Sequence, residues 1–161
     1  MYRINQLLNQ ERKLFHTQDL GLLWQIEDKN LLYTTIKRYV QKGILTRIHK
    51  GFYCIGKISD HDSLILGLAF YHDFAYLSTE TVLARFGAIN RQPQALTFVG
   101  SRPAKFWLNK QNYLFRQMKP ERLFQSKGIS LVDGVLTADL KRAAADMKYF
   151  NSSFHFDRRM R

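Results

Sequence analysis

The segment that most constrains the fold is residues 28–58, which combine a helical pattern with a hairpin pattern. Residues 29–42 contain no Pro or Gly, and Gly43 follows where a helix commonly ends in a left-handed residue. Asp28 is a suitable N-cap, because its carboxylate can accept hydrogen bonds from the free N–H groups of a first turn. The sequence therefore predicts a helix that begins after Asp28 and ends before Gly43.

This predicted helix has two different faces. At about 100° per residue, one face carries Leu32, Thr35, Ile36, Tyr39 and Val40. The opposite face carries amide, hydroxyl and cationic side chains, namely Asn30, Thr34, Lys37, Arg38 and Gln41. We expect the first face to lie in a core and the second to be exposed.

The residues on either side of the helix complete a pattern. Residues 44–49 are rich in β-branched side chains, which favours a strand. Lys50-Gly51 allows the chain to reverse direction, and residues 52–55 supply the second strand of a hairpin. Upstream lie a short helical pattern at residues 4–8 and a second helix that Thr17 is expected to cap. Helix, helix, turn, helix and hairpin are the order of a winged helix-turn-helix, which is predicted for residues 1–58.

The chemistry of this predicted domain fits duplex DNA. A helix fits the major groove, where amide, hydroxyl and cationic side chains contact base edges, and a basic hairpin can reach phosphates or the minor groove. The candidate DNA-binding residues are Lys29, Asn30, Tyr33, Thr34, Lys37, Arg38, Gln41, Arg47, His49 and Lys50. The alternative is an ordinary solvated helix face with lysines that bind nothing.

Composition favours an anionic partner. The 161 residues include 25 Lys or Arg against 13 Asp or Glu, a net charge of +12. The single Cys54 excludes an internal disulfide and a cysteine-based zinc cluster. The sequence has no apolar run long enough to span a membrane and no signal peptide, so we expect a cytoplasmic protein.

Residues 59–161 predict a second, small α+β domain, which makes the whole chain α+β with a boundary near residues 57–60. Helices are expected over residues 60–74, over residues 78–86, and from a cap at Thr137 to residue 150. Strands are expected at residues 95–99, 104–108 and 113–118, and within residues 129–136 around Asp133-Gly134.

No catalytic residue, metal ligand or cofactor is predicted, and we expect no enzymatic activity. His61 and His72 would lie about 16 Å apart along a helix, too far to share an ion. The spacing of Glu80, Asp133 and Asp146 is not typical of an acidic metal cluster. The side chain of Glu80 is expected to face solvent at its helix or to cap that helix. Asp139 and Asp146 are expected to form intrahelical pairs with nearby cations.

Several aromatic residues of the second part lie on predicted strands between cationic residues. These are Phe98, Phe106, Trp107, Tyr113 and Phe115. Strand aromatics usually fill a core, and that is the prediction for this set. The alternative is a surface on which single-stranded bases stack.

Two stretches together resemble the AbiEi family of antitoxins and transcriptional regulators. The first is LLYTTIKRYVQKGILTRIHKGFY at residues 31–53; the second is YLSTETVL at residues 76–83, followed by FGAI at 86–89 and ALTFV at 95–99. The resemblance covers nearly the whole chain. One departure is Lys141, which stands where the family's late helix often has an acid.

This resemblance implies a winged helix that binds operator repeats in double-stranded DNA and represses its own operon. It also implies a C-terminal domain that counters a nucleotidyltransferase-type toxin in a type IV toxin–antitoxin system. It leaves open whether the protein binds DNA as a dimer. The rival interpretations are a winged-helix regulator without a toxin partner and a nucleic-acid-processing enzyme.

Overall fold

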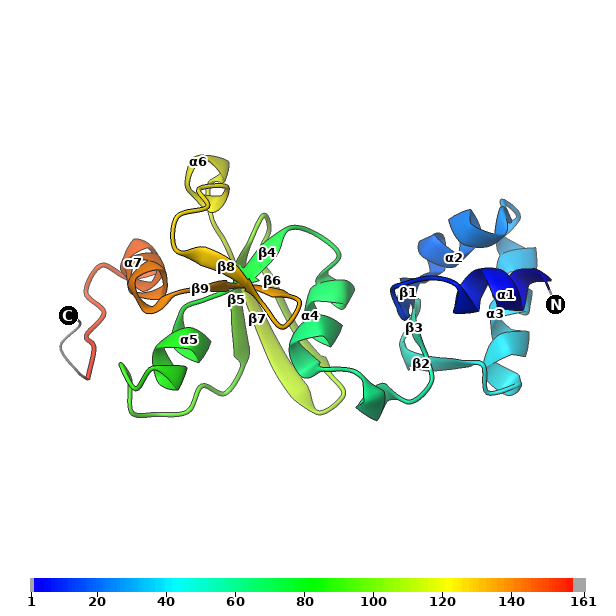
Figure 1. Cartoon of the computed structure of the whole chain (residues 1–161), viewed down its shortest axis with the longest axis horizontal. Helices are drawn as coiled ribbons and strands as arrows, with labels where there is room; N and C mark the ends of the chain where they lie inside the picture. Colours follow the sequence, from blue (N-terminus) through cyan, green and yellow to red (C-terminus); the bar gives the residue numbers. More distant parts are fainter. Residues whose placement is uncertain (1, 158–161) are drawn as a thin grey trace. The chain divides into compact units, whose positions relative to one another are not determined.

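The structure is a computed structural model that describes residues 2–157, and its chain divides into two compact units, Met1–Phe70 and Tyr71–Arg161. The segment predicted as the boundary, residues 57–60, contains the short 3₁₀ helix η1 (Ile58–Asp60). Helix α4 (Ser63–Tyr71) follows and ends at the division between the two units. Each unit has its own sheet (Figure 1).

The first unit consists of helices packed against a small antiparallel sheet. Its elements are α1 (Tyr2–Leu8), β1 (Leu14–His16), α2 (Thr17–Trp24), α3 (Lys29–Gln41), β2 (Leu45–His49) and β3 (Phe52–Ile55). The strand order is β1-β3-β2. Side chains from all three helices and from the sheet, such as Leu7, Phe15, Leu20, Ile36 and Leu45, form one buried cluster. Burial of this apolar surface is what holds these short elements together.

The helix predicted at residues 29–42 is confirmed as α3. The Oδ1 of Asp28 accepts a hydrogen bond from the backbone N of Leu31 at 2.8 Å, which caps the helix. Gly43 follows with φ of +77°, a conformation that favours glycine. The predicted core face is confirmed as well: Leu32, Thr35, Ile36 and Tyr39 are buried and Val40 is half-buried.

The second unit is built on a six-stranded mixed sheet of order β6-β7-β5-β4-β9-β8. Its strands are β4 (Ala75–Leu77), β5 (Leu96–Gly100), β6 (Ala104–Leu108), β7 (Gln111–Gln117), β8 (Ile129–Val132) and β9 (Val135–Ala138). Its helices are α5 (Glu80–Arg85), α6 (Pro120–Leu123) and α7 (Leu140–Phe150). β5 and β7 are parallel, as are β4 and β9, and the other neighbours are antiparallel.

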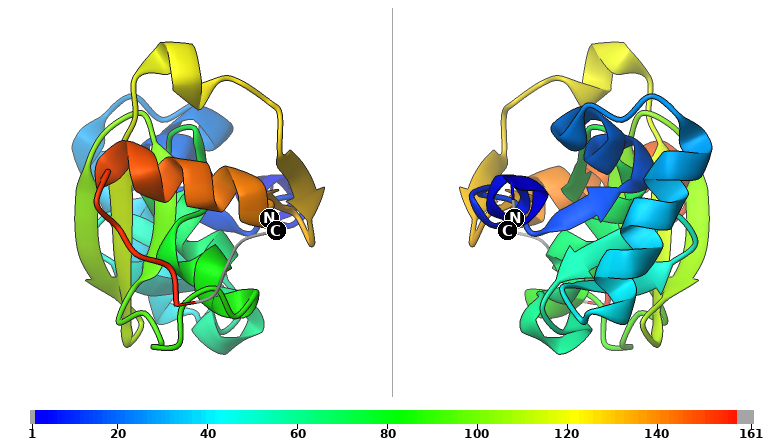
Figure 2. Two further views of the ribbon diagram at one scale, coloured as in Figure 1. Left: turned by 90° about the vertical axis from the view of Figure 1, so that its left-hand side faces the viewer. Right: turned by 90° about the vertical axis from the view of Figure 1, so that its right-hand side faces the viewer.

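The core of the second unit uses stacked rings. Phe115 stacks on Tyr71 with ring centroids 4.0 Å apart and on Phe98 at 4.6 Å. Helices α5 and α7 lie together on one face of the sheet, in front of the strands in the left panel of Figure 2. The predicted core role of the strand aromatics is therefore confirmed for Phe98, Tyr113 and Phe115, which are buried.

Some local predictions were wrong. Thr137 lies in β9 and does not cap the last helix; Asp139 does, because its Oδ1 accepts from the backbone N of Arg142 at 2.7 Å. Thr17 is the first residue of α2 and not its N-cap; the carboxylate of Asp19 instead accepts from the backbone N of His16 at 2.7 Å. The helix expected over residues 60–74 is limited to α4, and α6 was not predicted.

The described residues confirm the α+β class. They contain seven α-helices, a three-stranded antiparallel sheet and a six-stranded mixed sheet. Within residues 2–157, no helix has the length and apolar character needed to cross a membrane.

Candidate nucleic-acid interface

The segment from Lys29 to Ile58 has an unbalanced charge. It contains no Asp or Glu, and its cationic residues are Lys29, Lys37, Arg38, Lys42, Arg47, Lys50 and Lys57. All of these side chains are exposed, and none of them forms an ion pair with another residue of the part that the structure describes. Unpaired cations on neighbouring elements raise the local concentration of anions.

The position of α3 is set by its close approach to α2. A Cβ atom at Gly21 in α2 would lie 3.1 Å from the Cδ2 of Leu32, so the small residue permits this contact. Gln25 ends α2 in the left-handed conformation (φ 56°), and the backbone N of Ile26 donates to the carbonyl of Gly21 at 3.0 Å. These contacts produce a tight turn between α2 and α3, which places the core face of α3 inward and its polar face outward.

The ten predicted site residues are exposed side chains of α3, β2 and the turn after β2. They are Lys29, Asn30, Tyr33, Thr34, Lys37, Arg38, Gln41, Arg47, His49 and Lys50, and we call them the α3–hairpin surface. The Oγ1 of Thr34 donates to the carbonyl of Asn30 at 2.8 Å, so Thr34 presents a methyl group and an acceptor outward. Asn30 therefore offers the more versatile hydrogen-bonding group.

The hairpin is short and anchored at its tip. The carbonyl of Gly51 accepts a hydrogen bond from the backbone N of Thr17 at 3.0 Å. The pairing of β2 with β3 shifts register between Arg47 and His49, and such a bulge redirects side chains. The ring of His49 packs edge-on against Phe70 at 5.1 Å, so Arg47 and Lys50 are the less constrained groups of the hairpin.

A buried polar cluster lies in the second unit. Asp146 has no exposed surface, and its Oδ2 accepts from Tyr76 Oη at 2.9 Å and from Ser78 Oγ at 2.7 Å. Its Oδ1 accepts from Arg142 Nε at 3.2 Å. Burial, followed by the charge of Asp146, raises the pKa of Tyr76, so its hydroxyl stays protonated and donates. This cluster ties β4 to α7.

Arg142 completes this cluster. Its guanidinium also donates to the backbone carbonyls of Arg122, Gln125 and Lys127, at 3.1, 2.7 and 2.9 Å. The sequence prediction of an intrahelical pair is confirmed for Arg142 and Asp146, and both side chains are buried. No sequence spacing indicated that the side chain of Arg142 would donate hydrogen bonds to the loop before β8.

A second ion pair joins α5 to β7. Arg116 binds both carboxylate oxygens of Glu80, at 2.5 Å each, so the prediction that Glu80 solvates or caps its helix was wrong. Burial by itself raises the pKa of Glu80, but the hydrogen bonds and the charge of Arg116 outweigh it and lower the pKa below its ordinary value. Glu80 is therefore an ionised carboxylate whose charge is balanced by Arg116.

Thr79 has the least favourable backbone in this region. Its φ of 61° and ψ of −134° are costly for a β-branched residue. Its hydroxyl donates to the carbonyl of Ser78 at 2.7 Å and accepts from Arg116 Nη1 at 3.0 Å. A strained residue between a strand and a helix is where α/β-hydrolases place a nucleophile. Thr79, however, is fully buried and donates its proton to a carbonyl, which does not activate it.

The histidines considered as metal ligands have other contacts. His61 Nε2 lies 3.1 Å from the carbonyl of Ile55, and His72 is an exposed residue after α4. In the described part of the chain, no three His, Cys, Asp or Glu side chains gather in a geometry that could hold a metal ion. Burial raises the pKa of Cys54, which favours its thiol form.

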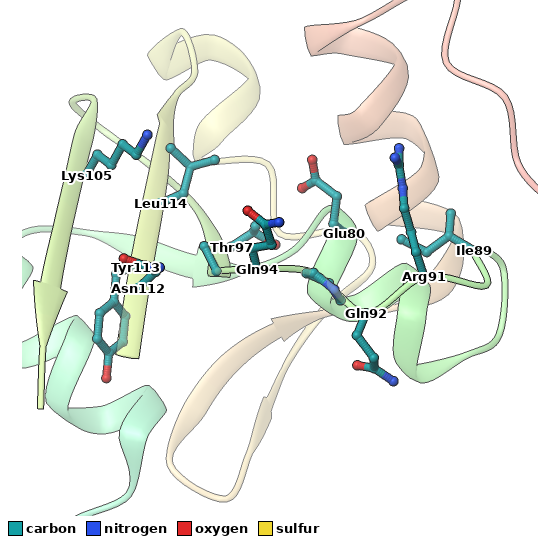
Figure 3. Close-up of a pocket in the computed structure, with 12 residues that line it drawn as sticks. Glu80, Ile89, Arg91, Gln92, Gln94, Thr97, Lys105, Asn112, Tyr113 and Leu114 are labelled. Atoms are coloured by element: carbon teal, nitrogen blue, oxygen red, sulfur yellow. The ribbon is translucent and has the colours of Figure 1, made fainter. Parts of the chain in front are cut away.

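The second unit also contains a pocket of about 590 Å³ (Figure 3). We call it the sheet pocket. It is lined by residues of α5, of the loop before β5, and of strands β5, β6 and β7: Glu80, Ile89, Arg91, Gln92, Pro93, Gln94, Ala95, Thr97, Lys105, Asn112, Tyr113 and Leu114. Its volume lies within the range typical of ligand sites.

No model of a known protein family matches the sequence, and no curated protein matches it. The resemblance to the AbiEi family therefore rests on the residues alone, and the functional proposals depend on the surfaces described above.

Proposed function

We propose that the first unit is a winged helix-turn-helix domain that binds double-stranded DNA through the α3–hairpin surface. In this proposal α3 is the recognition helix in the major groove, and Arg47 and Lys50 contact phosphates beside it. The observation that carries the proposal is the acid-free segment from Lys29 to Ile58, whose cations are exposed and unpaired in the described structure.

The order of elements supports this proposal. Two helices joined by a short turn, followed by a two-stranded hairpin, match the arrangement in which the second helix reads DNA. The close contact between Gly21 and Leu32 is consistent with such a helix pair. Asn30 and Gln41 could bind adenine edges, whereas Lys37 and Arg38 could bind phosphates.

Base reading and phosphate binding predict different effects of substitution. Asn30→Ala should weaken binding to a duplex selected for high affinity by about 1–3 kcal/mol, with little effect on random duplex, because a base-edge contact is lost. Lys50→Ala should weaken both by similar factors, because phosphates are the same in every sequence. The measurement is fluorescence anisotropy with labelled selected and random duplexes.

The matched control for Asn30 is Asn9→Ala, which removes an exposed amide of the same unit outside the α3–hairpin surface. It should leave both affinities unchanged. Equal losses on selected and random duplexes with Asn30→Ala would contradict the assignment of this residue to base reading.

We further propose that the protein is a non-enzymatic repressor of its own operon and the antitoxin of a type IV toxin–antitoxin system. The support is the AbiEi resemblance, which extends into the second unit at residues 76–99. In this proposal the first unit binds operator repeats and the second unit counters a nucleotidyltransferase-type toxin. Because the two roles reside in separate compact units, they should be separable by substitution.

Co-expression with a nucleotidyltransferase-type toxin encoded next to this chain, which the proposal predicts, tests this division. The full-length chain should restore growth, and Lys37→Ala/Arg38→Ala should restore it equally while no longer repressing a reporter placed behind the operon promoter. Both proteins are compared at equal cellular levels. Loss of rescue together with loss of repression would contradict separate roles, and no rescue by the unmodified chain would contradict the antitoxin proposal itself.

A further inference from the structure

One face of the strand pair β6–β7 carries an exposed aromatic residue. In their antiparallel register Lys105 lies opposite Leu114, and Trp107 lies opposite Asn112, so these side chains project from the same face of the sheet. The neighbouring rings of Tyr113 and Phe115 project from the other face and are buried. Trp107 is 60% exposed, in contrast to the buried strand aromatics. Its indole is therefore available to a ligand.

The exposed face continues into the sheet pocket. Lys105, Asn112 and Leu114 line this pocket together with Arg91 and Gln94 from the loop before β5 (Figure 3). The lining of the pocket thus combines apolar residues, such as Leu114, with amide and cationic groups. These are the features of a site that orients a small polar ligand.

The sheet pocket has a net positive charge. Lys105 and Arg91 are exposed, and neither makes an ion pair with a residue in the range 2–157. Glu80 also lines the pocket, but its carboxylate is paired with Arg116 and does not neutralise the charges of Lys105 and Arg91. An anionic group of a ligand could therefore bind without displacing an existing ion pair.

We propose that the sheet pocket and Trp107 form a second nucleic-acid site, which binds a nucleotide by its base and its phosphate. The base stacks on the indole of Trp107, the amide of Asn112 pairs with the base edge, and Lys105 on the same strand as Trp107 binds the phosphate; Arg91, on the other side of the pocket in Figure 3, would bind the phosphate of a neighbouring nucleotide. Stacking tolerates any base, because every base has a π face. The site is separate from the α3–hairpin surface and takes bases that are not paired in a duplex.

The spacing along β6 suits such a ligand. Lys105 and Trp107 are two residues apart on one face of a strand, a separation of roughly 7 Å between their Cα atoms. The ammonium and the indole can therefore contact the phosphate and the base of one nucleotide or of two neighbours. The same chemistry is offered by a free nucleotide and by a single strand, which the experiment must distinguish.

Fluorescence of the full-length chain gives a direct readout. Its two tryptophans differ, because Trp24 is 5% exposed and Trp107 is 60% exposed. A ten-residue oligothymidylate should quench the emission of Trp107 in a saturable manner. Thymidine 5′-monophosphate is the second probe: comparable affinity would identify a free nucleotide as the ligand, and much tighter binding of the oligomer would identify a single strand.

Variants locate the site. Trp107→Ala should weaken binding of labelled oligothymidylate about 5- to 150-fold, the range expected for loss of one stacked base. Lys105→Ala should weaken it as well, whereas Lys141→Ala, which removes an exposed lysine of the same unit outside the sheet pocket, should not. Lys37→Ala/Arg38→Ala should also leave it unchanged, which separates this site from duplex binding. All replaced side chains are exposed, and thermal unfolding checks that each variant is folded.

Three results would overturn this proposal. The first is the absence of saturable quenching by either probe. The second is unchanged binding of oligothymidylate by both Trp107→Ala and Lys105→Ala. The third is competition by poly-glutamate as effective as that by oligothymidylate, which would assign the sheet pocket to an acidic polypeptide.

Discussion

Replacing Asp146 by Ala is expected to lower the free energy of unfolding by about 3–5 kcal/mol, because it leaves the buried guanidinium of Arg142 without its counter-charge. Asp146 is fully buried and also accepts hydrogen bonds from Tyr76 and Ser78. Both hydroxyls would lose this acceptor in a place that water does not reach. The loss therefore combines an unpaired charge with two lost hydrogen bonds, and Tyr76 Oη keeps only the Sδ of Met118, a weak acceptor at 3.7 Å.

Urea unfolding followed by circular dichroism measures this loss. Asp146→Asn keeps the shape and one carbonyl acceptor, so its loss should be smaller than that of Asp146→Ala. Glu121→Ala removes an exposed carboxylate of the same unit and should change the free energy of unfolding by less than about 0.5 kcal/mol. A loss for Asp146→Ala as small as that for Glu121→Ala would contradict the role of the buried cluster.

The sequence predicted the helix and the hairpin of residues 28–55 well because their signals are local. Asp28 as a cap, Gly43 as a stop and the turn at Lys50-Gly51 each act within a few residues, and the structure has a helix or strand end at each place. The apolar periodicity of α3 selected the face that is buried. The binding role of the exposed face remains a prediction, because exposure alone does not show a ligand.

The second unit was less predictable because its determinants are distant in sequence. Arg142 donates hydrogen bonds to the carbonyls of Arg122, Gln125 and Lys127, and Glu80 of α5 pairs with Arg116 of β7. Neither contact has a spacing that helical or strand periodicity could reveal. The strained backbone of Thr79 is likewise set by the surrounding hydrogen bonds and not by its residue type.

Trp107 illustrates the same limit. Its strand was predicted with the correct bounds, and strand aromatics were expected to fill the core. Alternation along β6 and β7 decides which rings are inside, and this depends on the pairing of the strands. The sequence therefore identified the aromatic set but not the exposed member of it.

The second large effect is expected from salt. The α3–hairpin surface and its flanking lysines should contact about four to six phosphates per protomer, so the logarithm of the duplex-binding constant should fall against the logarithm of salt concentration with a slope of roughly −4 to −5. Raising salt from about 50 to 200 mM should then weaken binding roughly 250- to 1,000-fold. The cause is the release of counterions that the unpaired cations displace from the DNA.

The most direct test of the proposed DNA-binding surface is this slope, measured by anisotropy of a labelled duplex for three full-length proteins. The unmodified chain should give the slope stated above. Lys37→Ala/Arg38→Ala should reduce its magnitude by about 2, because each phosphate contact contributes about one unit. Lys141→Ala, an exposed cation of the second unit, should leave it unchanged. A slope near zero for the unmodified chain, or an unchanged slope for Lys37→Ala/Arg38→Ala, would contradict DNA binding through α3 and the hairpin.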